Sequence, residues 1–277
     1  MVKFPAKAHL FLAFILACVF SILVPNLIIQ SKLRTNKATV EKTYEKIYCV
    51  MVTGKSDKRK AFARISIENF KMQRYPNKVL VIVNEGDPLN VADENVIEVL
   101  VPNRDKITLG DMRNIAFEYI PNNAIWTTWD DDDWRSEDYL SYLKSNLGDV
   151  DYVFFTRRIE HNLNNGFTFI MELRSGFVIM FGRKKPFTIY DSKDFNEDVL
   201  LKKIIIENLK YKTLQNDPKM YVRLSHDDNT STLVKPEKSK VRDTSGNKVY
   251  FEYSADEEEI AYAKMIVKNF EKSLKMP

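Results

Sequence analysis

The stretch "AIWTTWDDDDWRSEDYL", which runs from Ala124 to Leu140, places four consecutive aspartates, Asp130 to Asp133, directly after an apolar run. A short apolar run rich in β-branched and aromatic residues is typical of a buried strand. Neighbouring carboxylates repel each other, so a positive group is expected to lie against them. Two interpretations stay open from these residues alone. The carboxylates hold a divalent cation, which prefers oxygen ligands, or they form a solvated acidic turn that caps the next helix.

Apolar strands alternate with helices along the chain on both sides of this stretch. The predicted strands are 46–54, 77–87, 95–102 and 124–130, and the predicted helices are 58–73, 109–120, 136–147 (with Ser136 as N-cap) and 196–209. From 151 to 184, and again from 219 to 229, strands with polar breaks are expected, in a pattern that suits antiparallel pairing. The alternation predicts an α/β fold with a mostly parallel sheet flanked by helices. In such sheets the functional crevice lies beyond the carboxyl ends of the strands.

The composition fits a folded protein and excludes some classes of function. Of 277 residues, 44% are hydrophobic and 29% are charged, with a net charge of +4 that is spread along the chain. Because no block of Lys or Arg stands out, nucleic acid is not an expected partner. The two cysteines, Cys18 and Cys49, lie in separate predicted elements, so no disulfide is expected.

A long uncharged segment near the start of the chain, Ala8–Ile29, predicts a membrane anchor. At ~1.5 Å per residue it is long enough to cross a ~30 Å hydrocarbon core, and it exceeds the apolar region of a cleaved signal peptide, the alternative interpretation. Lysines and arginines flank both ends, so the side of the membrane stays open. The predicted organisation is a tail (1–7), a single-pass anchor (8–29), a stem (30–45), a catalytic domain (46–253) and a C-terminal amphipathic helix (254–277).

Five segments, in this order and spacing, resemble the family-two glycosyltransferases with a GT-A fold. They are "VMVTG", "VLVIVNEGD", "TLGDMRNIAF", "WTTWDDDDWRSEDYL" and "FNEDVLLKKI". The resemblance rests on the acidic-Gly turn after the second strand, an Arg-Asn pair on a helix, an Asp-x-Asp motif followed by an aromatic residue, and a Glu-Asp pair that opens a helix. It implies a Rossmann-like GT-A sheet and a nucleoside-diphosphate-sugar donor.

The resemblance also assigns roles to individual residues. It implies that the donor is bound by Thr53, Glu85, Arg113, Asn114, Asp130 and Asp131. It implies a divalent cation, Mn²⁺ or Mg²⁺, held by Asp130, Asp132 and His226. Asp198 would be the general base toward the acceptor hydroxyl, with inversion at the anomeric carbon, and Glu197 would orient it. The alternative for Glu197 and Asp198 is that both only favour the N-terminus of a helix, and for His226 it is a plain loop position.

Three functions therefore stay open at this point. The first is a membrane-anchored, metal-dependent inverting glycosyltransferase that acts on a glycan, lipid or protein acceptor. The second is an inactive relative that binds a nucleotide sugar or a glycan as a scaffold. The third is a phosphate hydrolase that uses the acidic run. Asn229-Thr230-Ser231 matches a glycosylation sequon. Its place beside the expected site weakly favours a non-luminal domain or an unused sequon.

Overall fold

The computed structural model describes residues 44–101, 107–173, 180–215, 219–227, 229, 240–242, 248–254 and 257–274. The predicted tail and anchor, and the stem up to residue 43, lie outside these ranges. Within them, no helix is both long and apolar enough to cross a membrane. The helices are α2 (Asp57–Lys71), α3 (Leu109–Glu118), α4 (Tyr139–Leu147), α5 (Val199–Asn208) and α6 (Glu257–Leu274). The strands are β1 (Ile47–Thr53), β2 (Lys78–Asn84), β3 (Val96–Leu100), β4 (Ile125–Thr128), β5 (Trp134–Arg135), β6 (Tyr152–Phe155), β7 (Arg157–Asn162), β8 (Thr168–Leu173), β9 (Met180–Arg183), β10 (Tyr211–Leu214), β11 (Tyr221–Ser225), β12 (Lys240–Arg242) and β13 (Lys248–Ser254).

The larger sheet has seven strands in the order β10-β6-β9-β4-β1-β2-β3. Strand β9 runs antiparallel to both of its neighbours, β4 and β6, and every other neighbouring pair is parallel. Parallel neighbours need a crossover connection. Helix α2 makes the crossover from β1 to its neighbour β2, and α3 lies in the connection that returns from β3 to β4 on the other side of β1. The predicted α/β fold with a mostly parallel sheet is confirmed.

Helices cover both faces of this sheet. Successive side chains of a strand point to opposite faces, so an apolar strand presents apolar side chains on both faces, and each face is covered. On β1, Cys49 and Met51 belong to a core that also contains residues of α2 and α4. Val50, between them, belongs to the core on the other face, with Met112 of α3 and Leu201 of α5. Near-continuous apolar strands are expected where both faces are buried, and this accounts for the β1 and β2 sequences.

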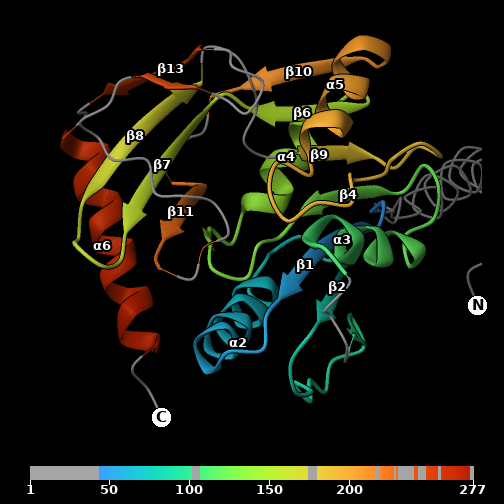
Figure 1. Cartoon of the computed structure of the whole chain (residues 1–277), viewed down its shortest axis with the longest axis horizontal. Helices are drawn as coiled ribbons and strands as arrows, with labels where there is room; N and C mark the ends of the chain where they lie inside the picture. Colours follow the sequence, from blue (N-terminus) through green and yellow to red (C-terminus); the bar gives the residue numbers. More distant parts are fainter. Residues whose placement is uncertain are drawn as a thin grey trace, which may run out of the picture. The chain divides into compact units, whose positions relative to one another are not determined.

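A second sheet of six strands, in the order β12-β13-β8-β7-β11-β5, lies to one side together with α6 (Figure 1). Most of its neighbouring pairs are antiparallel, and β7 and β11 are parallel. Ala263 and Val267 of α6 are buried with Phe62 of α2 and Ile159 of β7. The apolar stripe of the C-terminal helix is therefore part of a core, and the helix packs on the body of the domain.

One predicted helix start is wrong. Ser136 was expected to cap the helix at 136–147, but α4 begins at Tyr139 with Asp138 at the N-cap position and no side-chain capping bond. The reason is the short strand β5, whose residues Trp134 and Arg135 pair with β11. The Ser136 backbone N–H extends this pairing by donating to the Met220 carbonyl at 3.0 Å. Long-range strand pairing thus replaces the local capping signal.

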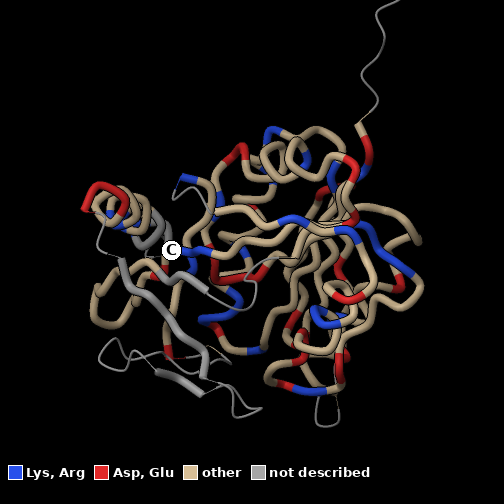
Figure 2. Tube along the Cα trace, turned by 90° about the horizontal axis from the view of Figure 1, so that it is seen from above, with Lys and Arg blue, Asp and Glu red and all other residues tan. Residues whose placement is uncertain are grey.

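Charged side chains are distributed over the described part of the chain. Figure 2 shows basic and acidic residues interspersed along the trace. This agrees with the absence of a Lys or Arg block in the sequence. Cys49 is buried and free, and Cys18 lies outside the described residues.

Candidate active site

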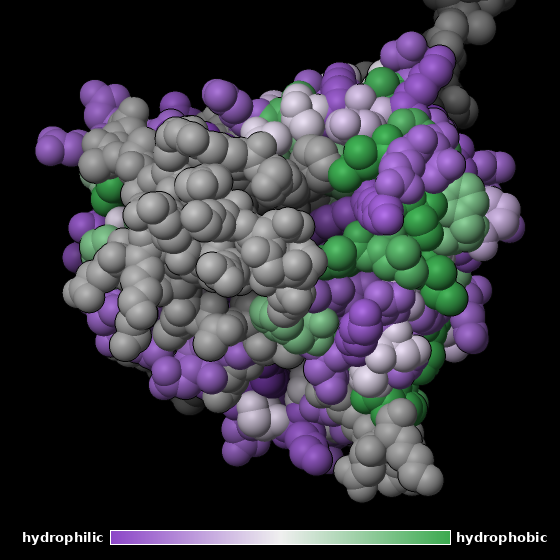
Figure 3. All heavy atoms as spheres, turned by 45° about the horizontal axis from the view of Figure 1, so that its top comes forward, coloured by the Kyte–Doolittle hydropathy of each residue, from purple (hydrophilic) through white to green (hydrophobic). Residues whose placement is uncertain are grey.

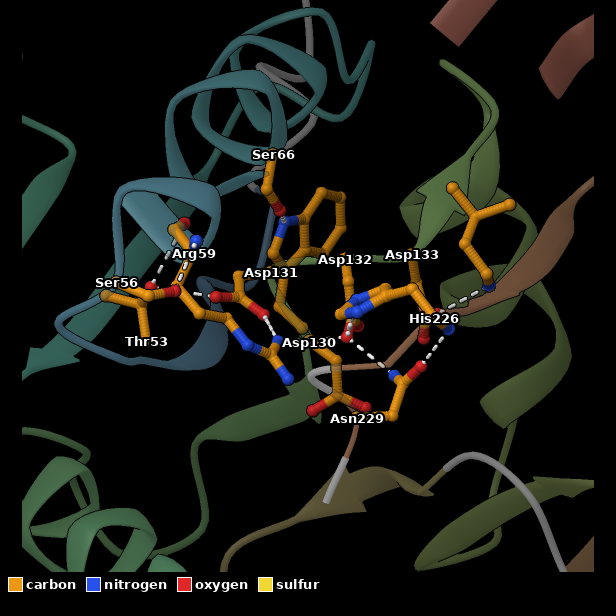
Figure 4. A network of polar contacts seen from close by, with 12 residues as sticks. Thr53, Ser56, Arg59, Ser66, Asp130, Asp131, Asp132, Asp133, His226 and Asn229 are labelled. Atoms are coloured by element: carbon orange, nitrogen blue, oxygen red, sulfur yellow. Dashed lines mark hydrogen bonds and ion pairs between the residues drawn. The ribbon is translucent and has the colours of Figure 1, made fainter. Parts of the chain in front are cut away.

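The acidic run lies at the carboxyl edge of the larger sheet. Strands β1, β2 and β4 are parallel, so Thr53, Asn84 and Thr128 end them at the same edge. Trp129, which follows β4, is fully buried, and its Nε1 donates to Ser66 Oγ of α2 at 3.0 Å. Trp129 is therefore core, and it ties the start of the acidic run to α2. Figure 4 shows Asp131 directed toward Thr53 and Arg59, and Asp132 directed toward His226 and Asn229.

Asp131 points inward, toward the end of β1 and the start of α2. Thr53 Oγ1 donates to Asp131 Oδ2 at 2.7 Å, and Arg59 Nη1 donates to Asp131 Oδ1 at 2.6 Å. Only 2% of Asp131 is exposed. Burial and the neighbouring Asp132 carboxylate raise the pKa of Asp131 to about 8, against the opposing charge of Arg59.

Asp132 is bonded by groups from two other parts of the chain. Its Oδ2 atom accepts from Arg59 Nη1 at 2.9 Å and from Asn229 Nδ2 at 2.9 Å, and it lies 3.1 Å from His226 Nε2. The imidazole of His226 is buried and stacks on the Phe62 ring with centroids 4.6 Å apart. Burial alone would raise the pKa of Asp132, but His226 and Arg59 outweigh it and hold the pKa at about 2.

Asp133 connects the acidic run to β11. Tyr221 Oη donates to Asp133 Oδ2 at 2.6 Å, and the Leu224 backbone N–H donates to Oδ1 at 3.1 Å. The connection places His226, which directly follows β11, beside Asp132. Burial, and then the Asp132 charge, raise the pKa of Asp133 to about 7. Asp133 therefore serves to hold β11 in place.

Arg135 is fully buried next to Asp133 and is enclosed by aromatic rings. Its guanidinium carbon lies 4.4 Å from the Trp129 ring centroid and 5.6 Å from that of Tyr221. Its Nη1 donates to the Asp130 and Asp133 carbonyls at 3.1 and 3.3 Å. The Arg135 cation offsets the negative charge of the acidic run. It lies at a buried position where aromatic rings and backbone carbonyls surround it in place of water.

Replacing Arg135 by alanine is expected to lower the free energy of unfolding by about 3–5 kcal/mol, because it leaves buried acceptors and an acidic run without their cation. Denaturant unfolding followed by tryptophan fluorescence measures the loss. Arg74→Ala is the matched control, since 64% of the Arg74 side chain is exposed and it pairs with Glu137 and Asp138 at the surface. Exposed pairs of that kind contribute at most ~1 kcal/mol. Equal losses in the two variants would contradict the structural role of Arg135.

Asp130 is the most accessible of the four aspartates, with 41% of its side chain exposed. Arg113 of α3 reaches it from Nη2 at 3.2 Å, and Arg113 Nη1 also pairs with Glu197. The guanidinium lies 5.1 Å from the ring centroid of the buried Tyr190. Burial raises the pKa of Glu197, and the charge of Arg113 opposes this. The structure thus brings Asp130, Arg113 and Glu197 together from three separate predicted motifs.

Asp198 is the N-cap residue of α5, but its side chain makes no capping bond. It pairs instead with Lys202 one turn later, at 2.5 Å, and 25% of its side chain is exposed. Burial would raise the pKa of Asp198, but Lys202 lowers it below the ordinary value. The carboxylate is therefore ionised at neutral pH and in contact with solvent.

The remaining predicted donor-binding residues, Asn114 and Glu85, lie on either side of this centre. Both polar atoms of the Asn114 side chain are bonded to the Tyr190 backbone, at 2.8 and 2.9 Å. Asn114 therefore fastens the loop that carries Tyr190 and Glu197 onto α3. Glu85 follows β2 beside the end of β1, and a Cβ at Gly54 would stand 3.1 Å from Glu85 Oε1. The proposed contacts of both with a donor stay predictions.

No protein-family model matches the sequence, and no curated protein matches it significantly. Among solved structures, two crystal structures of TarS from S. aureus resemble the chain at TM-scores of 0.49 and 0.50, with 14% and 13% identity. Each match covers 65% of this chain but only 60% and 37% of the respective TarS chain. The mannosyltransferase PcManGT from Pyrobaculum calidifontis, in complex with GDP-Man and Mn²⁺, has a TM-score of 0.48 and 13% identity over 78% of this chain and 69% of its own.

The chain has a GT-A-like fold. The solved neighbours are glycosyltransferases, and at this identity the likeness shows the fold and nothing finer. The expected resemblance is confirmed at that level.

Several residues of this GT-A-like site had no signal in the sequence. Arg59 joins Asp131 and Asp132, Asn229 donates to Asp132, and Tyr221 donates to Asp133. Arg59 and Tyr221 lie on elements whose pattern indicates only a helix and a strand, and Asn229 stood out only as a sequon. Each is at least 72 residues from its aspartate in the sequence, so proximity could not be read from local spacing.

The residues at Asp132 fit a divalent cation by ligand type, but not as a closed protein cage. Among the described residues, no group of three or more His, Cys, Asp or Glu side chains is placed to hold a metal ion. Asp132 Oδ2 and His226 Nε2 are 3.1 Å apart, about the separation of adjacent ligands on an octahedral ion with bonds of ~2.1 Å. Mg²⁺ is commonly bound by one or two carboxylates plus substrate phosphates. Asp132 fits that pattern, His226 would add a nitrogen ligand, and Arg59 would keep its bond to Asp131.

Proposed function

We propose that the protein is a membrane-anchored, metal-dependent glycosyltransferase that moves a sugar from a nucleoside-diphosphate donor to an acceptor hydroxyl with inversion. The observation that carries the proposal is the convergence of Arg113, Asp130 and Glu197 at the carboxyl edge of β1 and β4. Three motifs that resembled glycosyltransferase motifs separately meet in one place. Ligands bind at this edge in open α/β sheets, which supports a donor site there.

The diphosphate of the donor is the group that this edge suits. Asp132 and His226 would hold a Mn²⁺ or Mg²⁺ ion, which would supply Lewis-acid stabilisation of the leaving diphosphate. Arg113 orients Glu197 and Asp130, while Arg59 offsets the charge of the two inner aspartates. Thr53 and Asp131, fixed to each other, form the rigid floor of the donor site. Preorganised groups of this kind need no rearrangement as charge develops.

The acceptor side of the proposal rests on Asp198. An ionised, partly exposed carboxylate can accept the proton of an acceptor hydroxyl as its oxygen attacks the anomeric carbon. Glu197 is held by Arg113 and is 7% exposed, which suits orientation better than contact with an acceptor. The acceptor oxygen would attack the anomeric carbon from the face opposite the diphosphate, whose bond to that carbon breaks in the same step, and a single displacement of this kind gives inversion.

A donor screen tests the proposal. The full-length protein is incubated with a panel of nucleoside-diphosphate sugars, and release of nucleoside diphosphate is measured with Mn²⁺, with Mg²⁺ and with excess EDTA. We expect one donor to be turned over, and EDTA to abolish turnover. Hydrolysis of a phosphomonoester offered in place of the donor would identify a phosphate hydrolase. Donor binding measured by calorimetry, without turnover, would identify an inactive binding relative. Full turnover in EDTA would contradict the metal.

A further inference from the structure

Exposed large hydrophobic side chains are concentrated in one segment of the described chain. Thirteen such residues are exposed, and seven of them lie between positions 187 and 211. Six of these form what we call the α5 face: Phe187, Ile189, Phe195, Val199, Leu200 and Ile206, with exposed fractions between 39% and 54%. Single exposed hydrophobic residues are ordinary, whereas a concentration of this kind marks an interaction surface.

The loop and the helix that carry the α5 face turn these side chains in the same direction. In the loop before α5, Thr188 and Tyr190 are buried while Phe187 and Ile189 are exposed. On α5, Leu201 and Ile205 are buried and Val199 and Ile206 are exposed. Tyr190, Leu201 and Ile205 belong to the same core on one face of the larger sheet. The exposed set therefore faces away from that core, and Figure 3 shows hydrophobic residues gathered on this side among hydrophilic ones.

Lysines accompany the apolar residues. Seven lysines and five carboxylates lie between positions 184 and 212, and two of the carboxylates, Glu197 and Asp198, are paired with Arg113 and Lys202. Lys203 shares the exposed side of α5 with Val199 and Ile206; its side chain is 67% exposed and lies 3.9 Å from Glu207. Lys193 is 61% exposed and pairs with Asp191 at 3.0 Å. Exposed pairs of this kind are weak, so both ammonium groups can also face lipid headgroups. Apolar side chains with lysines at their edge are the composition that inserts into the headgroup region of an anionic bilayer.

We propose that the α5 face docks the catalytic domain onto the surface of an anionic bilayer. The chain outside the described residues supports this partner over others. The predicted anchor ends at Ile29, and the 14 residues from 30 to 43 span at most ~50 Å when fully extended, so the domain stays close to the bilayer. The docking rests on the proposed membrane anchor and on exposure and charge, but it does not depend on the proposed sugar transfer, because its test reads contact with lipid.

A fluorescent label tests the docking on the full-length chain. Cys18→Ser gives a background in which the remaining Cys49 is fully buried. Ile189→Cys and Val199→Cys are each labelled with NBD, and Met72→Cys at the end of α2, over the opposite face of the larger sheet, is the control. All three positions are 54% exposed. The proteins are reconstituted in phosphatidylcholine vesicles containing phosphatidylglycerol and lipids with brominated tails.

We expect a blue-shifted NBD emission and quenching by brominated lipid at Ile189 and Val199, and neither at Met72. Lys193→Glu with Lys203→Glu should lower the quenching at Val199 several-fold, whereas Lys264→Glu with Lys268→Glu on α6 should not. A label at Val199 that is as water-exposed as that at Met72 would overturn the proposal. A blue shift without quenching would also overturn it, because residues 1–43 or a second copy would then cover the face. If quenching at Val199 is unchanged by Lys193→Glu with Lys203→Glu, the role of the anionic lipid surface is contradicted.

Discussion

Replacing Asp132 by alanine is expected to lower the transfer rate by about 10³-fold or more while the protein stays folded. A divalent ion that neutralises a leaving diphosphate contributes several kcal/mol to the transition state, and each 1.36 kcal/mol is worth a factor of ten in rate. The fold should persist because Arg59 keeps its 2.6 Å bond to Asp131. The charge of Asp132 also raises the pKa of both Asp131 and Asp133, so its removal relieves repulsion in the acidic run.

The measurement is nucleoside-diphosphate release at saturating donor and metal, with thermal unfolding measured on the same samples. Asp87→Ala is the matched control, because Asp87 lies near the same sheet edge but 87% of its side chain is exposed. It should retain the full rate. His226→Ala is expected to raise the metal concentration needed for half-maximal rate. An Asp132→Ala protein that is folded and fully active would contradict the proposed metal dependence.

Replacing Asp198 by asparagine is expected to lower the transfer rate by roughly 10²–10⁴-fold, the usual worth of a general base, with near-normal donor binding. Asparagine keeps the shape and the ability to cap α5 but cannot take a proton. Donor binding is measured by calorimetry and transfer at saturating donor and metal. Glu197→Gln should cost less, because Glu197 is held by Arg113.

The pH dependence separates a base from a helix cap. Lys202 lowers the pKa of Asp198, so the base form persists to a pH below the ordinary pKa of an aspartate, and the acid limb of the rate profile lies there. Lys202→Met removes the lowering charge, so the folded pKa rises and the acid limb moves to higher pH. If Asp198→Asn transfers sugar at close to the wild-type rate, the base lies elsewhere.

Local pattern was enough to predict the order of the elements from β1 to β4 and the place of the acidic run, whereas β5, β10, β12 and β13 were not predicted. The period of apolar residues is a property of neighbours in sequence, and it located β1, β2, α3 and β4 to within a few residues. When aspartates directly follow a buried strand, they lie at the sheet edge where that strand ends, whichever strands pair with it. The adjacent carboxylates Glu197 and Asp198, directly before an apolar helix, could be recognised from local pattern in the same way.

Only the tertiary structure decided which charges meet and which elements end early. Arg59, Arg113 and Tyr221 lie 72, 84 and 88 residues from the carboxylates they contact, and helical or strand periodicity carries no information over such separations. The antiparallel insertion of β9 and the shortening of the helix at Ser136 likewise depend on partner strands. The sequence alone predicts four aspartates that need positive charge. In the folded chain Arg135, two residues after the run, and Arg59 and Arg113, from two helices, supply that charge. Burying these carboxylates requires cations, and long-range packing brings Arg59 and Arg113 into contact with them.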